Sequence, residues 1–209
     1  HYTSLVTMCY AMLGVVLSDG GYSFLFFWEL MTVASFLLIL FDAERREVRR
    51  AALSYLIMMH IGFVLLLIGF VRLDVATGDT SFGALAAAFR TQPVLPLYLL
   101  FLAGFGMKAG LFPMHVWLLE AHPAAPSHVS ALMSGVMIKT GVYGILRVTA
   151  ALGEQPLLHT AGVILLAAGV VTGLWGVILA AMQNDVKRLL AYSSVEHMGI
   201  LALAVGLGG

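Results

Sequence analysis

Residues 94–117 read VLPLYLLFLAGFGMKAGLFPMHVW, an apolar stretch that is long enough to cross a membrane yet carries a lysine and an internal proline. A membrane-spanning helix needs about 20 mostly apolar residues. Pro113 lacks an amide hydrogen, and the glycines at positions 104, 106 and 110 lower the cost of unwinding the chain nearby. We therefore expect a transmembrane helix that breaks just after Lys108, with a simple proline kink as the alternative.

The composition of the whole chain fits the same environment. Of the 209 residues, 61% are hydrophobic and only 11% are charged, whereas a soluble domain carries about 25% charged residues. Eleven Lys and Arg balance eleven Asp and Glu, and Cys9 is the single cysteine. We therefore expect the lipid bilayer as the surroundings, no nucleic-acid partner, no internal disulfide, and no cofactor or metal held by the chain itself.

Further apolar runs on both sides of residues 94–117 predict an all-α fold, a polytopic transmembrane helix bundle of six or seven spans with one broken helix. A polar segment at 72–93 separates two of the spans, and we expect a short interfacial helix at 82–90. The expected spans are 3–17, 20–41, 51–71, 94–117, 127–147, 160–182 and 189–205. Because the chain opens on His1 and ends without a polar tail, we expect a fragment of a longer protein, with no signal peptide to remove.

The orientation of the bundle follows from its basic residues, since cytoplasmic loops are enriched in Lys and Arg. If the loop at 42–50 lies inside, the inner side collects six basic residues and the outer side three. The inner set is Arg45, Arg46, Arg49, Arg50, Lys187 and Arg188, and the outer set is Arg72, Arg90 and Arg147. We therefore expect a multi-pass protein of the inner, or plasma, membrane with the 42–50 loop in the cytoplasm.

Glu29, Lys108 and Lys139 are charged residues that lie within the expected spans. A charged residue at the bilayer centre costs about 2.5–3.5 kcal/mol on insertion scales, so each is a candidate for function. Glu29 has a structural ion pair as its alternative role. Lys139 could reach an interface, but the nearer helix end is about eight residues, or roughly 12 Å, away. Small residues at 127, 131 and 135 also predict that this face packs against protein.

Histidines extend the set of candidates, because their ordinary titration range suits proton transfer. Each one has buried packing as an equally good explanation. The additional relay candidates are His60, His115, Glu196 and His197, while His122 and His128 flank an inner turn as either an entry point or a polar loop.

Three motifs occur in order along the chain: FWELM at 27–31, KAGLFPMHVWL at 108–118 and DVKRLLAYSS at 185–194. Together they resemble the proton-translocating membrane subunits related to cation/proton antiporters, which occur in respiratory complex I and in membrane-bound hydrogenase complexes. The segments 121–141 and 194–199 look most like the branch of hydrogenase-4 component B and formate hydrogenlyase subunit 3.

This resemblance implies a specific arrangement of the charged residues. Glu29 and Lys108 would form an ion pair, and a hydrated relay along the membrane midplane would continue to Lys139. It also implies two pseudo-symmetric five-helix units, of which residues 1–150 would be the first and residues 151–209 only the first two helices of the second. The implied partners are other membrane subunits and soluble redox subunits.

The sequence thus predicts a proton- or cation-translocating subunit that couples ion movement to electron transfer in partner subunits. One alternative is a stand-alone cation/proton antiporter subunit. Another is a membrane anchor of a hydrogenase complex, in which the charges are only structural. None of the three needs an enzyme active site within the chain, and the sequence carries no phosphate-binding glycine loop or catalytic triad pattern.

Overall fold

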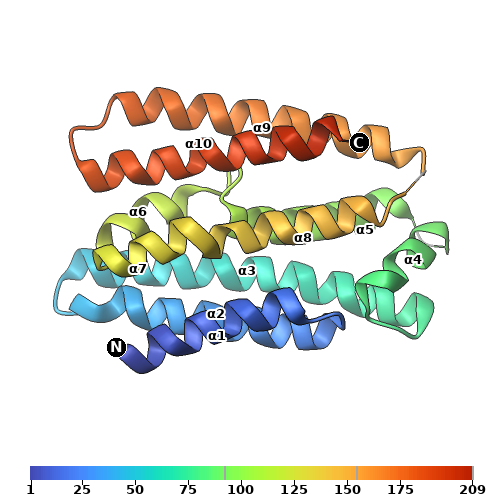
Figure 1. The fold of residues 1–209 in the computed structure, drawn as a ribbon, viewed down its shortest axis with the longest axis horizontal. Helices are drawn as coiled ribbons and strands as arrows, with labels where there is room; N and C mark the ends of the chain where they lie inside the picture. The colour runs from blue at the N-terminus through green and yellow to red at the C-terminus, as the bar shows by residue number, and fades with distance from the viewer. Residues whose placement is uncertain (92, 154, 209) are drawn as a thin grey trace.

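The computed structural model describes residues 1–91, 93–153 and 155–208, and within them the chain forms a bundle of long helices that lie side by side (Figure 1). Gln92, Glu154 and Gly209 lie outside the described residues, the last two within the expected second unit at 151–209. The longer helices are α1 (Tyr2–Leu17), α2 (Gly21–Ile39), α3 (Arg46–Thr77), α5 (Val94–Ala109), α8 (Ile138–Ala150), α9 (Leu157–Ala181) and α10 (Val186–Leu207). The shorter ones are α4 (Leu85–Thr91), α6 (Val116–Ala124) and α7 (Ser127–Leu132).

Five helical segments of the described chain are long and apolar enough to cross a membrane, and α1 and α5 are shorter apolar helices. Their connections alternate between the two ends of the bundle. The turns from α2 to α3, α6 to α7 and α9 to α10 share one end, on the left in Figure 1, and the α8–α9 connection lies at the other. The six basic residues expected inside therefore lie at one end of the bundle. The orientation across the membrane remains a prediction.

Helix α3 is longer than the expected span at 51–71. It begins at Arg46, runs for 32 residues and ends where Gly78 adopts a left-handed conformation with φ +70°. Arg49 closes the preceding turn by donating to the carbonyl oxygens of Ala43 and Glu44. The difference has a simple cause: hydropathy marks the part of a helix that lipid covers, whereas backbone hydrogen bonds continue through charged turns as long as no residue breaks them.

The short helix expected at 82–90 is present as a 3₁₀ turn, Phe82–Ala84, followed by α4, and its place at the membrane interface remains a prediction. The Ser81 hydroxyl accepts from the Ala84 amide, which begins the turn with a side-chain cap. Phe82 and Phe89 are buried against the bundle, so this segment covers the end opposite the α2–α3 turn (Figure 1).

The fourth expected span, 94–117, is a broken helix and not a kinked one. Helix α5 ends at Ala109, Gly110 takes a left-handed conformation with φ +72°, and helical structure resumes only at Val116. The fifth expected span, 127–147, consists of α7, one π-helical turn at Met133–Met137 and then α8.

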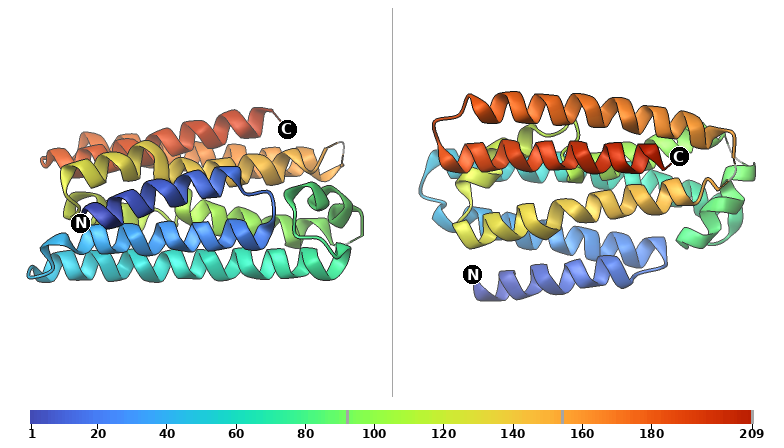
Figure 2. Two further views of the ribbon diagram at one scale, coloured as in Figure 1. Left: turned by 60° about the horizontal axis from the view of Figure 1, so that its bottom comes forward. Right: turned by 45° about the horizontal axis from the view of Figure 1, so that its top comes forward.

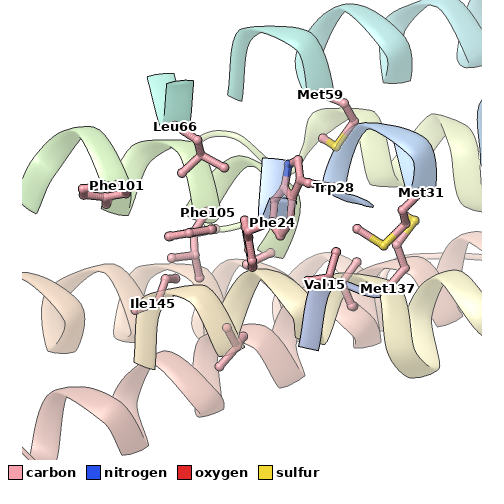
Figure 3. Close-up of a cluster of buried hydrophobic side chains, with 14 of the residues drawn as sticks. Val15, Phe24, Trp28, Met31, Met59, Leu66, Phe101, Phe105, Met137 and Ile145 are labelled. Carbon is pink, nitrogen blue, oxygen red and sulfur yellow. The ribbon is translucent and has the colours of Figure 1, made fainter. Parts of the chain in front are cut away.

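Helix α8 lies between two groups of helices (Figure 2). Helices α9 and α10 form a hairpin on one side, with α2 and α1 on the other side of α8 (Figure 2). In the hairpin the backbones touch, since a Cβ on Gly199 would overlap the amide nitrogen of Gly173. Figure 3 shows the main core, where Phe24, Trp28 and Phe105 meet with ring centroids 5.3–5.8 Å apart. The division into units at residue 150 remains a prediction.

Candidate functional site

Lys108 lies at the last turn of α5 and points into the bundle. Its side chain is only 1% exposed, and Nζ donates to the Thr32 hydroxyl at 2.6 Å. The ammonium group also lies 4.9 Å from the centroid of a Trp28 ring, a cation–π contact. The position at a helix C-terminus stabilises positive charge, because the helix dipole is negative there. Lys108 is therefore held by protein and does not face lipid.

The break after Lys108 leaves backbone groups that must be satisfied inside the membrane. The Trp117 indole N–H donates to the Met107 carbonyl at 2.9 Å, and the Phe112 amide donates to the Thr172 hydroxyl of α9 at 3.0 Å. His115 lies in the same segment, is 4% exposed and stacks on the Phe112 ring. Its Nδ1 is buried without a hydrogen-bond partner among the described residues.

Glu29 does not pair with Lys108, contrary to the expectation from the resemblance. Its Oε1 lies 3.0 Å from His60 Nε2 on α3, and no ion pair joins Glu29 to Lys108 within the described residues. The reason is the geometry of α2: Glu29 and Thr32 are one turn apart, and Lys108 binds the hydroxyl while the carboxylate leans toward α3. Lys108 therefore contacts α2 at Thr32, while Glu29, one turn away on α2, contacts α3.

The Glu29–His60 contact is a close approach of a carboxylate and an imidazole that lacks hydrogen-bond geometry. His60 Nδ1 lies 2.9 Å from the Leu56 carbonyl oxygen, and because a carbonyl can only accept, Nδ1 must carry a hydrogen. Both Glu29 oxygens are shielded from solvent, and the approach to His60 is their one close polar contact among the described residues.

Lys139 lies two residues beyond the π-helical turn and lines a polar cleft of about 390 Å³ between α7, α8 and α10. Its Nζ donates to the Ser134 carbonyl within that turn. Such single π turns often occur at functional positions. The polar side chains that line the cleft with Lys139 are His122, Ser127, Ser130, Ser134, Lys187, Ser193, Ser194 and His197. A cleft of this size and polarity has room for several water molecules.

The remaining predicted residues divide between this cleft and its surroundings. His197 lies in the cleft, with Nδ1 2.6 Å from the Ser193 carbonyl oxygen, whereas Glu196 is not among the lining residues. The backbone of Glu196 instead lies against Gly176 of α9. The structure therefore forms three groups from the predicted set: Glu29 with His60, Lys108 beside the break with His115, and Lys139 with His197.

The sites of the two lysines adjoin one another through α5 and α8. A Cβ on Gly141 would lie 2.6 Å from the Ala109 amide nitrogen and 2.7 Å from the Phe105 carbonyl oxygen, so only glycine allows this approach. Ala109 follows Lys108, and Gly141 is two residues beyond Lys139. A displacement of α5 or α8 at this contact therefore changes the positions of both lysines relative to each other.

Sequence reasoning missed the buried hydroxyl groups around Lys108. The Ser35 Oγ lies 2.5 Å from the Tyr55 hydroxyl, and both residues are fully buried. One signal was available: Glu29, Thr32 and Ser35 recur at three-residue steps on an otherwise apolar helix, which places them near one face. The partners from α3 and α5 could not be read from that spacing.

Comparisons with known proteins agree with this architecture. A family model described as NADH:quinone oxidoreductase/Mrp antiporter, transmembrane, matches residues 18–209. Hydrogenase-4 component B of Escherichia coli is 40% identical over 205 residues, which cover 94% of this chain and 30% of that protein. The chain thus spans about a third of the length of such curated relatives.

Two solved membrane complexes contain a chain with the same fold. One is the Mrp complex from Dietzia sp. DQ12-45-1b, with a TM-score of 0.91 and 28% identity over 100% of this chain and 23% of the other. The second is the membrane-bound sulfane sulfur reductase, an archaeal respiratory membrane complex, with a TM-score of 0.90 and 25% identity over 97% of this chain and 42% of the other.

Proposed function

Since the chain belongs to the NADH:quinone oxidoreductase/Mrp antiporter membrane family, we propose that it is the proton-carrying part of an ion-translocating subunit, with Glu29, Lys108 and Lys139 as its relay. The family and the apolar helices establish a multi-pass protein of the plasma membrane. The proposal adds that protons move through these side chains, and that electron transfer in other membrane and soluble subunits drives them.

The observation that best supports this proposal is the placement of the two lysines. Lys108 is buried beside a break in its helix, and Lys139 lines a polar cleft that can admit water. A compact ammonium group can release its proton inside a protein, whereas a guanidinium cannot. Lys139 is therefore suited to exchange protons with water in the cleft, and Lys108 to exchange them with groups inside the bundle.

Glu29 supplies a movable countercharge in this scheme. In the structure it contacts His60, and a movement of its carboxylate toward Thr32, one turn along α2, would bring it close to Lys108. At about 5 Å and an effective dielectric constant of about 20, the attraction between carboxylate and ammonium is roughly 3.3 kcal/mol, and at about 10 Å it is roughly 1.7 kcal/mol. When the carboxylate lies near His60, the lysine would thus release its proton more readily. When the carboxylate lies near Lys108, the lysine would retain it.

One such movement is too weak to drive transport alone. The difference of roughly 1.7 kcal/mol is smaller than the roughly 2.3 kcal/mol needed to move one charge against 100 mV. Additional charges or a redox reaction must supply the remainder. This requirement favours a subunit of a larger complex, in keeping with the respiratory complex that contains a chain of the same fold.

The proposal is tested in the full-length protein within its parent complex, reconstituted into vesicles with a pH-sensitive dye inside. Lys139→Gln and Lys139→Arg should both reduce proton translocation by about 100-fold, the scale of a positioned proton-transfer group, while the complex still assembles. Arg keeps the charge but cannot release a proton. Lys187→Arg, in the same cleft, is the matched control and should translocate normally. Wild-type rates in either Lys139 variant would remove this residue from the relay.

A second candidate, a cation/proton antiporter without a redox partner, is favoured by the similarity to the Mrp complex. The same vesicles separate the two, because the redox-driven subunit translocates protons only when an electron donor is added. If the chain is instead only an anchor, the lysine variants should lower the yield of the complex and leave translocation per assembled complex unchanged.

A further inference from the structure

Tyr55 on α3 contacts three elements that surround the two lysines: α2, α6 and the π-helical turn. Its side chain is fully buried. The hydroxyl lies 2.5 Å from Ser35 Oγ on α2 and 3.8 Å from Met137 Sδ, and the ring centroid lies 5.1 Å from that of Trp117. Met137 belongs to the π-helical turn before Lys139.

Two of these contacts lead to Lys108. Ser35 Oγ is 2.9 Å from the carbonyl oxygen of Thr32, the residue whose hydroxyl accepts from Lys108. Trp117, on which the Tyr55 ring packs, donates to the Met107 carbonyl, which directly precedes Lys108. Tyr55 therefore supports both the acceptor of Lys108 and the broken helix end that carries it.

The hydroxyl groups of Ser35 and Tyr55 have two arrangements of their hydrogens. In one, Tyr55 donates to Ser35, and Ser35 donates to a carbonyl of α2, either Met31 at 2.8 Å or Thr32. In the other, Ser35 donates to Tyr55, and Tyr55 donates to the weaker acceptor Met137 Sδ. Both arrangements tie α3 to α2 through the Ser35–Tyr55 hydrogen bond, and the second also ties α3 to the π-helical turn.

We propose that Tyr55 is a positioning residue that couples the placement of Lys108 to the π-helical turn before Lys139. The inference rests on the proposed function, since it concerns the same two lysines. Tyr55 itself takes no proton from either lysine. It sets how closely the hydroxyl of Thr32 is held against Lys108 when the turn at Met133–Met137 changes.

Tyr55→Phe is the main test, because it removes the hydroxyl and keeps the ring on Trp117. In the full-length complex we expect normal assembly and a proton translocation rate reduced by roughly fivefold to tenfold, the scale of one lost buried hydrogen bond. Tyr98→Phe is the matched control: Tyr98 is also buried, and its hydroxyl meets Thr149 Oγ1 at 3.2 Å, at the other end of α5. It should translocate normally.

A second measurement separates positioning from general packing. Ser35→Ala should reduce translocation as much as Tyr55→Phe, and Ser35→Thr should retain it. The double variant Ser35→Ala/Tyr55→Phe should be no worse than either single variant, because the effects of removing both partners of one interaction do not add. Wild-type rates in Tyr55→Phe, an equal loss in Tyr98→Phe, or additive effects in the double variant would overturn the inference. If the Lys139 variants also translocate normally, the proposed function itself fails; if only Tyr55→Phe does, this inference alone fails.

Discussion

Replacing Gly141 by alanine changes no polar group, yet it should disturb Lys108. The added Cβ would lie 2.6 Å from the Ala109 amide nitrogen and 2.7 Å from the Phe105 carbonyl oxygen. Contacts shorter than 3.4 Å are rare for real Cβ atoms, and these neighbours are backbone atoms that cannot rotate away. Helices α5 and α8 must therefore separate by about 0.8 Å, the kind of overpacking that costs about 1–3 kcal/mol.

The same displacement reaches the lysine next to Ala109. If α5 carries Lys108 away from α2 by that amount, the distance from Nζ to the Thr32 hydroxyl grows from 2.6 Å to about 3.4 Å, beyond the range of a good hydrogen bond. Loss of a hydrogen bond to a charged group costs about 1.5–3 kcal/mol, which corresponds to roughly 10- to 150-fold. We expect Gly141→Ala to lower translocation within that range.

The assay combines the melting temperature of the purified complex with translocation per assembled complex in vesicles. Gly173→Ala is the control, because a Cβ there has its nearest neighbours at 3.9 and 4.0 Å, within another transmembrane helix. It should preserve both the melting temperature and the rate. Normal translocation by Gly141→Ala, or an equal loss in Gly173→Ala, would refute the claim that the α5–α8 approach positions Lys108.

Three further outcomes follow from other parts of the structure. His60→Gln keeps a polar side chain but removes the imidazole beside Glu29, so translocation should fall several-fold with unchanged assembly; wild-type rates would exclude the Glu29–His60 contact from the mechanism. Arg147→Gln removes the 2.9 Å ion pair with the exposed Asp19. The free energy of unfolding, measured by denaturant titration, should fall by about 1 kcal/mol at most, and translocation should stay normal. Hydrogen bonds from the amide and hydroxyl of Ser81 lower the pKa of Asp79 from its ordinary 3.8. The stabilisation they give is present above pH 3.8 and is lost as the pH falls through the lowered pKa. Hydrogen exchange in the 79–82 turn should therefore accelerate at low pH in the native chain and not in Asp79→Asn.

Most of the membrane fold was predictable because lipid imposes a simple rule. The expected spans at 20–41, 127–147, 160–182 and 189–205 each fall on helical structure within a few residues of its bounds. The break after Lys108 was predictable because proline and glycine act on the backbone locally. At the polar start and end of α3, hydropathy does not indicate where the helix begins and ends, so the expected span at 51–71 was shorter than the helix.

The candidate site was predictable only as a set of residue types. An ionisable side chain within an apolar span stands out in any sequence, and this identified Glu29, Lys108 and Lys139. The partners of these side chains depend on which helices become neighbours. The preference of Glu29 for His60, and the role of a hydroxyl as the acceptor for Lys108, come from helices that are distant in the sequence.

By itself, the sequence determined that the chain enters a bilayer, where its helices begin and break, and which few positions carry charge, because each of these depends on local composition and backbone chemistry. Only the tertiary structure decided which charges meet, that a polar cleft of about 390 Å³ opens beside Lys139, and that α5 and α8 touch through Gly141. These features depend on side-chain contacts between helices, and no local pattern specifies them.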